Sequence, residues 1–163
     1  MNAILRTGYL ALAIILAFAY SADAGSLEDG LAAYARGNYA TALKFWQPNA
    51  EQGHAEAQNN LGVIYANGRG VPRDDVEAVK WYRKAGEQGN AVAQFNLGVS
   101  YMNGWGVPQD YVSAHKWFNL IAASDNEKVH RFREEVAKRM TPDQIAEAER
   151  TAREWLETHG KAE

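Results

Sequence analysis

The feature that most constrains the fold of this chain is an internal repeat. Residues 55–90 and 91–126 align without gaps at an offset of 36 residues, and 19 of the 36 aligned positions are identical. A fixed period of this length marks a stack of one supersecondary unit, because each unit buries its apolar face only against its neighbours. The sequence therefore predicts an array of repeated units rather than a globular domain with a single central core.

The first part of each copy has the pattern of a helix. Leu61 and Tyr65 in one copy, and Leu97 and Tyr101 in the next, place apolar side chains on one helical face. Each copy also carries a glycine beside this stripe, which costs about 1 kcal/mol relative to alanine inside a helix. We therefore expect these glycines, Gly62 and Gly98, to lie where a neighbouring helix needs the space.

A loop and a second helix follow in each copy. Residues 67–74 and 103–110 share the pattern N-G-x-G-V-P-x-D. Gly68 and Gly104 suit the left-handed residue that ends a helix, and the following proline prevents the helix from continuing. Asp74 and Asp110 are suitable N-caps for the next helix. Each copy is thus predicted to be a helix–loop–helix unit.

The segments on either side of the two copies extend this pattern. Residues 34–42 resemble the repeat with five loop residues removed, so residues 25–54 are expected to form a degenerate N-terminal repeat. Pro48 should end or kink the second helix of that repeat. Residues 127–163 depart from the repeat and predict two charged amphipathic helices, the second beginning at Thr141, that cap the array. The predicted fold class is all-α, an α-solenoid of stacked helix–loop–helix repeats with a C-terminal helical cap.

The N-terminus has the layout of a secretory signal peptide. Arg6 precedes a run of 12 apolar residues, Tyr9–Tyr20, and the small-x-small pattern Ala22-Asp23-Ala24 follows. This run is short for a membrane span of about 20 residues, although an uncleaved membrane anchor is the alternative interpretation. We expect residues 1–24 to be removed, which leaves no stable membrane anchor and a periplasmic or secreted protein.

Composition excludes several classes of function. The chain has 17 Lys and Arg residues against 20 Asp and Glu residues, so its net charge of −3 gives no attraction for nucleic acid. Cysteine is absent, which rules out disulfides, zinc–thiolate sites and cysteine nucleophiles. The four histidines do not form a ligand pair at helical or short extended spacing. We therefore expect no metal and no cofactor.

One pair of short motifs resembles the motifs of an enzyme. Residues 113–116 fit S-x-x-K, and residues 124–126 fit S-D-N, two patterns of serine β-lactamases and penicillin-binding proteins. However, Lys116 is the repeat's own lysine, equivalent to Lys80, and Ser113 occupies a variable position of the repeat. The K-T-G motif is missing as well. We predict that the chain has no catalytic residues and is not an enzyme.

The two copies resemble the Sel-one-like repeat, a relative of the tetratricopeptide repeat with a longer loop. The pattern A-x-A-Q-x-N-L-G-x-x-Y-x-x-G-x-G-V-P-x-D-x-x-x-A-x-K-W is nearly complete at 55–81 and 91–117. The resemblance implies an α-solenoid that acts as an adaptor or scaffold, without implying one particular partner. A cysteine-rich secreted branch of this family is linked to β-lactam binding, but this sequence lacks those cysteines.

In such stacks the first helix of each unit lines a concave groove, which predicts where a partner would bind. The predicted partner-binding groove comprises Glu56, Asn59, Val63, Ala66, Val92, Phe95, Val99, Met102 and Trp105. Trp105, between two loop glycines, is a candidate exposed anchor. The alternative for Phe95 and Met102 is that they pack on the following helix as part of the core.

Together these features predict a protein–protein interaction module of the bacterial cell envelope. We expect a monomer whose groove holds a protein or peptide of unknown identity. Two alternatives remain: a hydrolase or binder directed at the cell wall or at β-lactams, and a structural spacer. The fold by itself does not decide among these functions.

Overall fold

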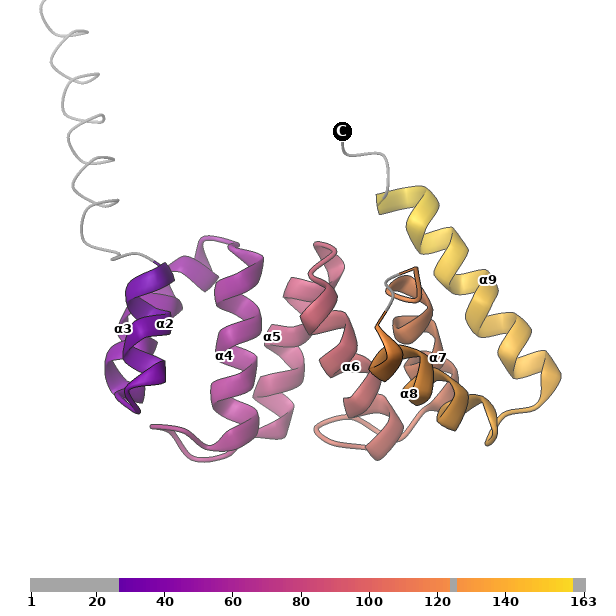
Figure 1. The fold of residues 1–163 in the computed structure, drawn as a ribbon, viewed down its shortest axis with the longest axis horizontal. Coiled ribbons are helices and arrows are strands. Elements are labelled where there is room, and N and C mark those ends of the chain that lie inside the picture. Colours follow the sequence, from indigo (N-terminus) through magenta and orange to yellow (C-terminus); the bar gives the residue numbers. More distant parts are fainter. Residues whose placement is uncertain (1–26, 124–125, 160–163) are drawn as a thin grey trace, which may run out of the picture.

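The computed structural model describes residues 27–123 and 126–159, which form α-helices connected by short loops, with no strand among the described residues. The helices follow one another along the long axis of the molecule, from α2 at one end to α8 and α9 at the other (Figure 1). They are α2 (Leu27–Ala35), α3 (Tyr39–Glu51), α4 (Ala55–Asn67), α5 (Asp75–Glu87), α6 (Ala91–Asn103), α7 (Tyr111–Leu120), α8 (Glu127–Ala137) and α9 (Pro142–His159).

Helices that are neighbours in sequence are also neighbours in space. Each of α2 to α7 packs against the next helix in the chain, and α9 returns to pack against α7. The pairs α2–α3, α4–α5 and α6–α7 are therefore successive units of one stack, and α8 and α9 close it (Figure 1). This arrangement confirms the predicted all-α solenoid.

Inside each unit, a glycine of the first helix contacts an aromatic ring of the second. A Cβ atom added to Gly62 would lie 2.4 Å from the Tyr82 ring, and one added to Gly98 would lie 2.4 Å from the Phe118 ring. Phe118 is fully buried. The two helices approach so closely only because glycine has no side chain, which confirms the reason expected for these glycines.

Between units, a buried glutamine joins each first helix to the end of the preceding helix. Gln58 donates from Nε2 to the Ala50 carbonyl at 3.0 Å, and Gln94 donates in the same way to the Gly86 carbonyl at 2.9 Å. Both glutamines are buried, so each bond satisfies a polar group that could not reach water. The two bonds repeat at an offset of 36 residues and fix the spacing of the units.

The loops have the predicted helix ends. Gly68 and Gly104 are left-handed, with φ of 64° and 72°. The Asp74 carboxylate accepts from the backbone N–H of Glu77 at 2.9 Å, and Asp110 accepts from two N–H groups of α7. The predicted C-terminal and N-terminal caps are thus confirmed in both copies.

The second glycine of each loop packs on the preceding unit. A Cβ added to Gly70 would lie 2.8 Å from Cβ of Tyr39, and one added to Gly106 would lie 2.0 Å from the backbone oxygen of Asp75. Tyr39 and Asp75 are the first residues of α3 and α5, at the same offset of 36 residues. Each loop is therefore held against the start of the previous unit's second helix.

The degenerate first unit differs from its prediction in detail. Helix α3 does not end at Pro48 but continues to Glu51, where the Asn49 side chain donates to the carbonyl of Phe45. The loop of this unit, residues 36–38, has three residues against seven in residues 68–74, so it is shorter by four residues rather than five. The proposed signal peptide, residues 1–24, lies outside the described residues.

The cap begins as predicted. Thr141 and Gln144 exchange hydrogen bonds between side chain and backbone at 3.3 and 2.9 Å, which is a reciprocal capping box at the start of α9. Of the described helices, none combines the length and the apolar character that crossing a bilayer requires.

Candidate protein-binding face

A partly exposed apolar stripe lies along α6. Val92, Phe95 and Val99 recur at i, i+3 and i+7, so they share one face of the helix. Val92 is 59% exposed, while Phe95 and Val99 are half-buried. The stripe leads toward Trp105, whose indole is 49% exposed in the loop after α6.

A largely apolar pocket of about 290 Å³ lies at the N-terminal end of this stripe. The walls come from α6, from the end of α7 and from the start of α8. The Lys128 ammonium lies 4.6 Å from the centre of the Phe95 ring at the rim of this pocket. The lining residues are Ala91, Val92, Phe95, Ile121, Asn126, Lys128 and Val129.

A smaller pocket of about 90 Å³ lies toward the other end of the stripe, between α4, α5 and α6. The Trp105 indole forms one wall, and the Tyr82 ring of α5 also lines the pocket. Burial, with smaller contributions from Tyr34 and Asp75, raises the pKa of Tyr82, so its hydroxyl stays neutral. The lining residues are Ala66, Asp75, Ala78, Tyr82, Asn96, Val99, Ser100 and Trp105.

Phe95 and Met102 lie between this face and the core. The Phe95 ring contacts Phe132 of α8 and Phe118 of α7, with ring centres 5.3 and 5.7 Å apart. Met102 packs against the buried cluster that contains Phe118 and Val136. Both side chains are half-buried, so each contributes to packing while part of its surface reaches solvent.

The corresponding residues of the second unit are less accessible. Asn59 is only 6% exposed, and its side-chain oxygen accepts a hydrogen bond from Asn96 of α6 at 3.1 Å. Val63 and Ala66 are half-buried against the cluster formed by α5, α6 and α7. Glu56 is exposed at the start of α4. Asn59 and Val63 therefore mainly join α4 to the following helices.

The structure brings the predicted residues together in two groups. Val92 and Phe95 line the larger pocket, and Ala66, Val99 and Trp105 line the smaller one. The contribution of α5 and α8 was not predicted, because the predicted groove comprised only first helices of complete repeats and Trp105 of the following loop. Lys128 and Asp75 border the pockets from segments outside that pattern, and only their position next to Phe95 and Trp105 reveals them.

Charge divides the first helices from the second. Helix α2 carries Glu28 and Asp29, helix α4 carries Glu56, and neither contains a lysine, arginine or histidine. Helix α6 carries no charged residue at all. The first helices are therefore acidic in the first two units and neutral in the third, whereas the second helix α5 contains Lys80, Arg83 and Lys84.

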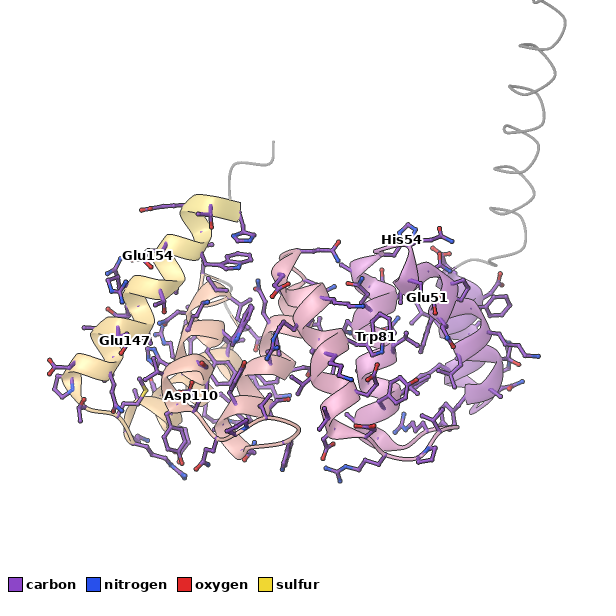
Figure 2. The ribbon with its side chains drawn as sticks, turned by 180° about the vertical axis from the view of Figure 1, so that it is seen from behind. Glu51, His54, Trp81, Asp110, Glu147 and Glu154 are labelled. Carbon is purple, nitrogen blue, oxygen red and sulfur yellow. The ribbon has the colours of Figure 1, made fainter. Side chains whose placement is uncertain are left out.

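The enzyme-like motif is occupied by structural contacts. The Ser113 hydroxyl donates to the Asp110 carboxylate at 2.6 Å, which is part of the cap of α7. The Lys116 ammonium lies 5.3 Å from the centre of the Trp117 ring. Ser124 and Asp125 lie outside the described residues. Ser113 and Lys116 line a pocket of about 420 Å³ between α7 and α9, together with Asp110, Val112, Glu147 and Thr151. Figure 2 labels Asp110 and Glu147 on the two sides of this region.

His115 and His54 lie in a packed helix and at a turn, respectively. His115 is buried, and the Asn119 amide donates to its Nδ1 at 2.9 Å. Burial, followed by the charge of Arg133, lowers the pKa of His115. His54 lies at the turn between α3 and α4 beside Glu51 (Figure 2). Over residues 27–123 and 126–159, no three His, Cys, Asp or Glu side chains gather as metal ligands would.

Two solved structures are similar to this chain. One is the crystal structure of c5321, a protective antigen of uropathogenic Escherichia coli strains that displays an SLR fold, with a TM-score of 0.77 and 32% identity. The similarity covers 86% of this chain but only 30% of c5321, so the chain spans less than a third of that protein. The other is a Sel1 repeat protein from Oxalobacter formigenes, with a TM-score of 0.56, 39% identity, and coverage of 60% of this chain and 74% of that protein.

A comparison with curated protein sequences gives no significant match. The Sel1 repeat family model, by contrast, matches residues 17–54, 55–90 and 91–126, which together are more than half of the chain. The third and second matches have the boundaries of the two aligned copies, and the first includes α2 and α3. The chain therefore belongs to the Sel1 repeat family, whose members generally mediate protein–protein interactions and are typically not catalysts.

Proposed function

We propose that this chain is a protein-interaction module that holds a segment of another protein along the exposed stripe of α6. The observation that carries the proposal is the exposure of Val92 and Trp105 at opposite ends of that stripe, each beside a pocket. Exposed aromatic and aliphatic side chains beside pockets are typical anchors of protein interfaces. A stripe of about 12 residues on a helix is roughly 18 Å long, enough for a short extended or helical segment.

The fixed position of Trp105 favours binding over a role as spacer. Its backbone N–H donates to the Ser100 carbonyl at 3.0 Å, and the glycines on either side are held by the helix end and by the start of α5. A backbone that is already held in place loses little conformational freedom when a partner covers its side chain. This geometry supports a binding role at the stripe.

We also propose that the protein works in the cell envelope, as an adaptor that acts as a monomer. The support for the envelope location is the N-terminal pattern of Arg6, the apolar run Tyr9–Tyr20 and the small residues Ala22-Asp23-Ala24. Expression of the full chain with a C-terminal tag, followed by fractionation and intact-mass measurement, tests this. The expected product is a periplasmic or secreted chain that begins at Gly25, and a full-length chain in the membrane fraction would contradict it.

The binding proposal is tested by cross-linking and affinity capture with the full tagged chain in envelope extract. The test variant carries Val92→Ser and Trp105→Ser, two exposed positions whose replacement should leave the fold intact. The matched control is Leu156→Ser, because Leu156 is 45% exposed on α9, away from the stripe. Circular dichroism should show the same helical content in all three proteins.

The expected result is one or more proteins that cross-link to the native chain and to the Leu156 variant but not to the double variant. Cross-linked peptides should include residues of α6. If the double variant retains every captured protein, the stripe is not the binding surface, and the assignment fails. Light scattering over a range of concentrations separates this function from self-assembly, since a spacer that assembles grows in mass with concentration.

A further inference from the structure

We infer that the pocket beside Trp105 binds the cationic side chain of a lysine or arginine in the partner. The inference deepens the proposed function and rests on it, because it names the chemistry of the segment held along α6. The long loops of the second and third units carry different residues at the same position of the repeat. In the second unit this residue is Arg69, and in the third unit it is Trp105.

At the second loop, the chain supplies its own cation to an aromatic site. The guanidinium of Arg69 lies 5.2 Å from the centre of the Tyr34 ring and 5.5 Å from that of Tyr39. Arg69 also donates to the Tyr34 hydroxyl. A guanidinium at this distance from two rings is held by cation–π attraction. This arrangement shows that the space between a loop and the preceding unit accommodates a cationic head group.

At the third loop, the backbone arrangement is the same, but the loop and the helix carry different side chains. Gly106 packs on Asp75 as Gly70 packs on Tyr39, so Trp105 is placed relative to Asp75 as Arg69 is placed relative to Tyr39. The loop now supplies the ring, and the helix supplies a carboxylate in place of a ring. Both groups attract a cation, but the loop position that provides one in the second unit is here aromatic.

The pocket beside Trp105 has the composition that such a head group requires. It holds about 90 Å³ between the indole of Trp105, the ring of Tyr82 and Asp75. Asp75 lines this space directly, and its negative charge also contributes to the raised pKa of Tyr82. Asn96 and Ser100 provide polar groups on the wall formed by α6. Rings, a carboxylate and side-chain oxygens together favour an ammonium or guanidinium over a neutral or acidic group.

One internal cation competes for this carboxylate. Arg73 donates from Nε and Nη2 to the two oxygens of Asp75, at 3.0 and 2.9 Å. The Arg73 side chain is 59% exposed, and ion pairs of such exposed groups are weak because water screens them. A partner cation that also stacks on Trp105 can therefore share Asp75 with Arg73. This competition predicts that removal of Arg73 strengthens binding.

The charge of the surrounding surface favours a basic segment on one side of the pocket only. Helix α6 carries no charged residue, and Lys128 lies at the rim of the larger pocket at the other end of the stripe. The acidic residues of the first helices, Glu28, Asp29 and Glu56, lie on α2 and α4. A basic segment is therefore attracted where it extends from the pocket beside Trp105 toward α4, and the pocket itself carries the inference.

The inference is tested by NMR titration of the full chain with Nα-acetyl-arginine methylamide, observing the Trp105 indole N–H. The signal is assigned as the one lost in Trp105→Phe. The matched probe is the corresponding citrulline compound, which has nearly the same shape as arginine but no charge. We expect a saturable shift with the arginine probe, and binding of the citrulline probe that is weaker by at least about three-fold.

Three variants locate the effect, with the Asn96 side-chain amide as a second signal. Asp75→Asn should raise the dissociation constant of the arginine probe about three-fold, and Trp105→Leu should raise it by at least that much. Arg73→Ala should lower it. Glu77→Gln is the control, because Glu77 is on the same helix turn as Asp75 but pairs with Lys80 and does not line the pocket.

Equal binding of the arginine and citrulline probes overturns the inference, as does an unsaturated shift or an unchanged affinity in Asp75→Asn. Weaker binding in Arg73→Ala also contradicts it, since Arg73 would then be helping rather than competing. These outcomes do not decide whether the proposed function is correct, because the capture experiment tests that function independently. If the capture experiment still identifies a partner on α6 while the probe fails, the partner binds the stripe without a cationic anchor.

Discussion

The second and third units have nearly the same backbone and the same internal joints, but they differ where they meet other parts of the molecule. In both, a glycine contacts a ring, Gly62 with Tyr82 and Gly98 with Phe118. In both, a glutamine donates to the end of the preceding helix. These glycine and glutamine residues, which are identical in the two copies, hold the stack.

The residues that differ between the two units are those that contact different neighbouring segments. Asn59 meets Asn96 of another repeat and forms a hydrogen bond, whereas Phe95 meets Phe132 of the cap and forms a ring contact. Arg69 meets two tyrosines, whereas its counterpart Trp105 stands beside Asp75 and stays half-exposed. A residue that differs between the copies is therefore first explained by packing against its neighbour. Only a differing residue that stays exposed is a candidate for binding a partner.

The strongest test of the comparison is alanine at the second loop glycine of each unit. Gly106→Ala should destabilise the protein by about 3 kcal/mol, because it combines a left-handed φ of 70° with a contact to a rigid backbone oxygen. Gly70→Ala should cost about 2 kcal/mol, since its added Cβ meets a side-chain carbon at 2.8 Å. Thermal and urea unfolding measure both. Equal losses would show that the two loops are not held differently.

A smaller loss is expected when the glutamine between units is replaced by leucine. Gln94→Leu should cost roughly 1–2 kcal/mol, because it removes one of the hydrogen bonds to the buried Gly86 carbonyl. Gln58→Leu should cost somewhat more, because Gln58 also accepts from Gln88 at 2.7 Å. Denaturant unfolding of the two variants gives the comparison, with Gln47→Leu on the exposed face of α3 as the control. A neutral result at both sites would mean that the repeated bond does not hold the units together.

Exchange of the loop residues should separate stability from binding. Arg69→Trp should destabilise the first interface by about 1 kcal/mol, since it removes a hydrogen bond and two ring contacts. Trp105→Arg should change stability by less than about 0.5 kcal/mol, because the indole is half-exposed, but should abolish capture of a partner. Unfolding and capture experiments on the same two proteins measure this. A large stability loss in Trp105→Arg would assign Trp105 to packing instead.

The smallest effect concerns pH and the buried His115, which replaces Val79 of the second unit. Burial lowers the pKa of His115 below 6.5; the charge of Arg133 on α8 lowers it further, and Glu149 on α9 opposes this. The unfolded chain then binds a proton at a higher pH than the folded chain, so this contribution to stability is full above pH 6.5 and decreases as pH falls below it. His115→Val should flatten the decrease, as unfolding at several pH values would show. An unchanged pH profile would exclude His115 as its source.

Much of the fold could be predicted because its determinants are local. Gly68, Gly104, Asp74 and Asp110 mark helix ends through backbone conformation and capping, which depend on residues close in the chain. Pro48 was less informative, since packing keeps α3 helical through a residue that local preference would place at its end. The role of Gln58 depends on a carbonyl eight residues away in the preceding helix, which no local pattern reveals.

The candidate site could be predicted only in part. Val92 and Trp105 are exposed, and the sequence identified both as candidates. The burial of Asn59 and the packing of Phe95 depend on which helix comes next, and that is decided by the whole stack. Asp75 enters the smaller pocket only because the loop of the third unit folds back onto it.

The joints between units have a further consequence for how such a protein can grow. The bond from Gln58 to Ala50 and the bond from Gln94 to Gly86 are the same joint one period apart, as are the contacts of Gly70 and Gly106 with α3 and α5. A second copy of residues 55–90 inserted after residue 90 would therefore find both partners of each of these contacts already in place. Residues 55–90 are thus a transferable cassette, and the length of the array can change by one whole period without redesign of any connection.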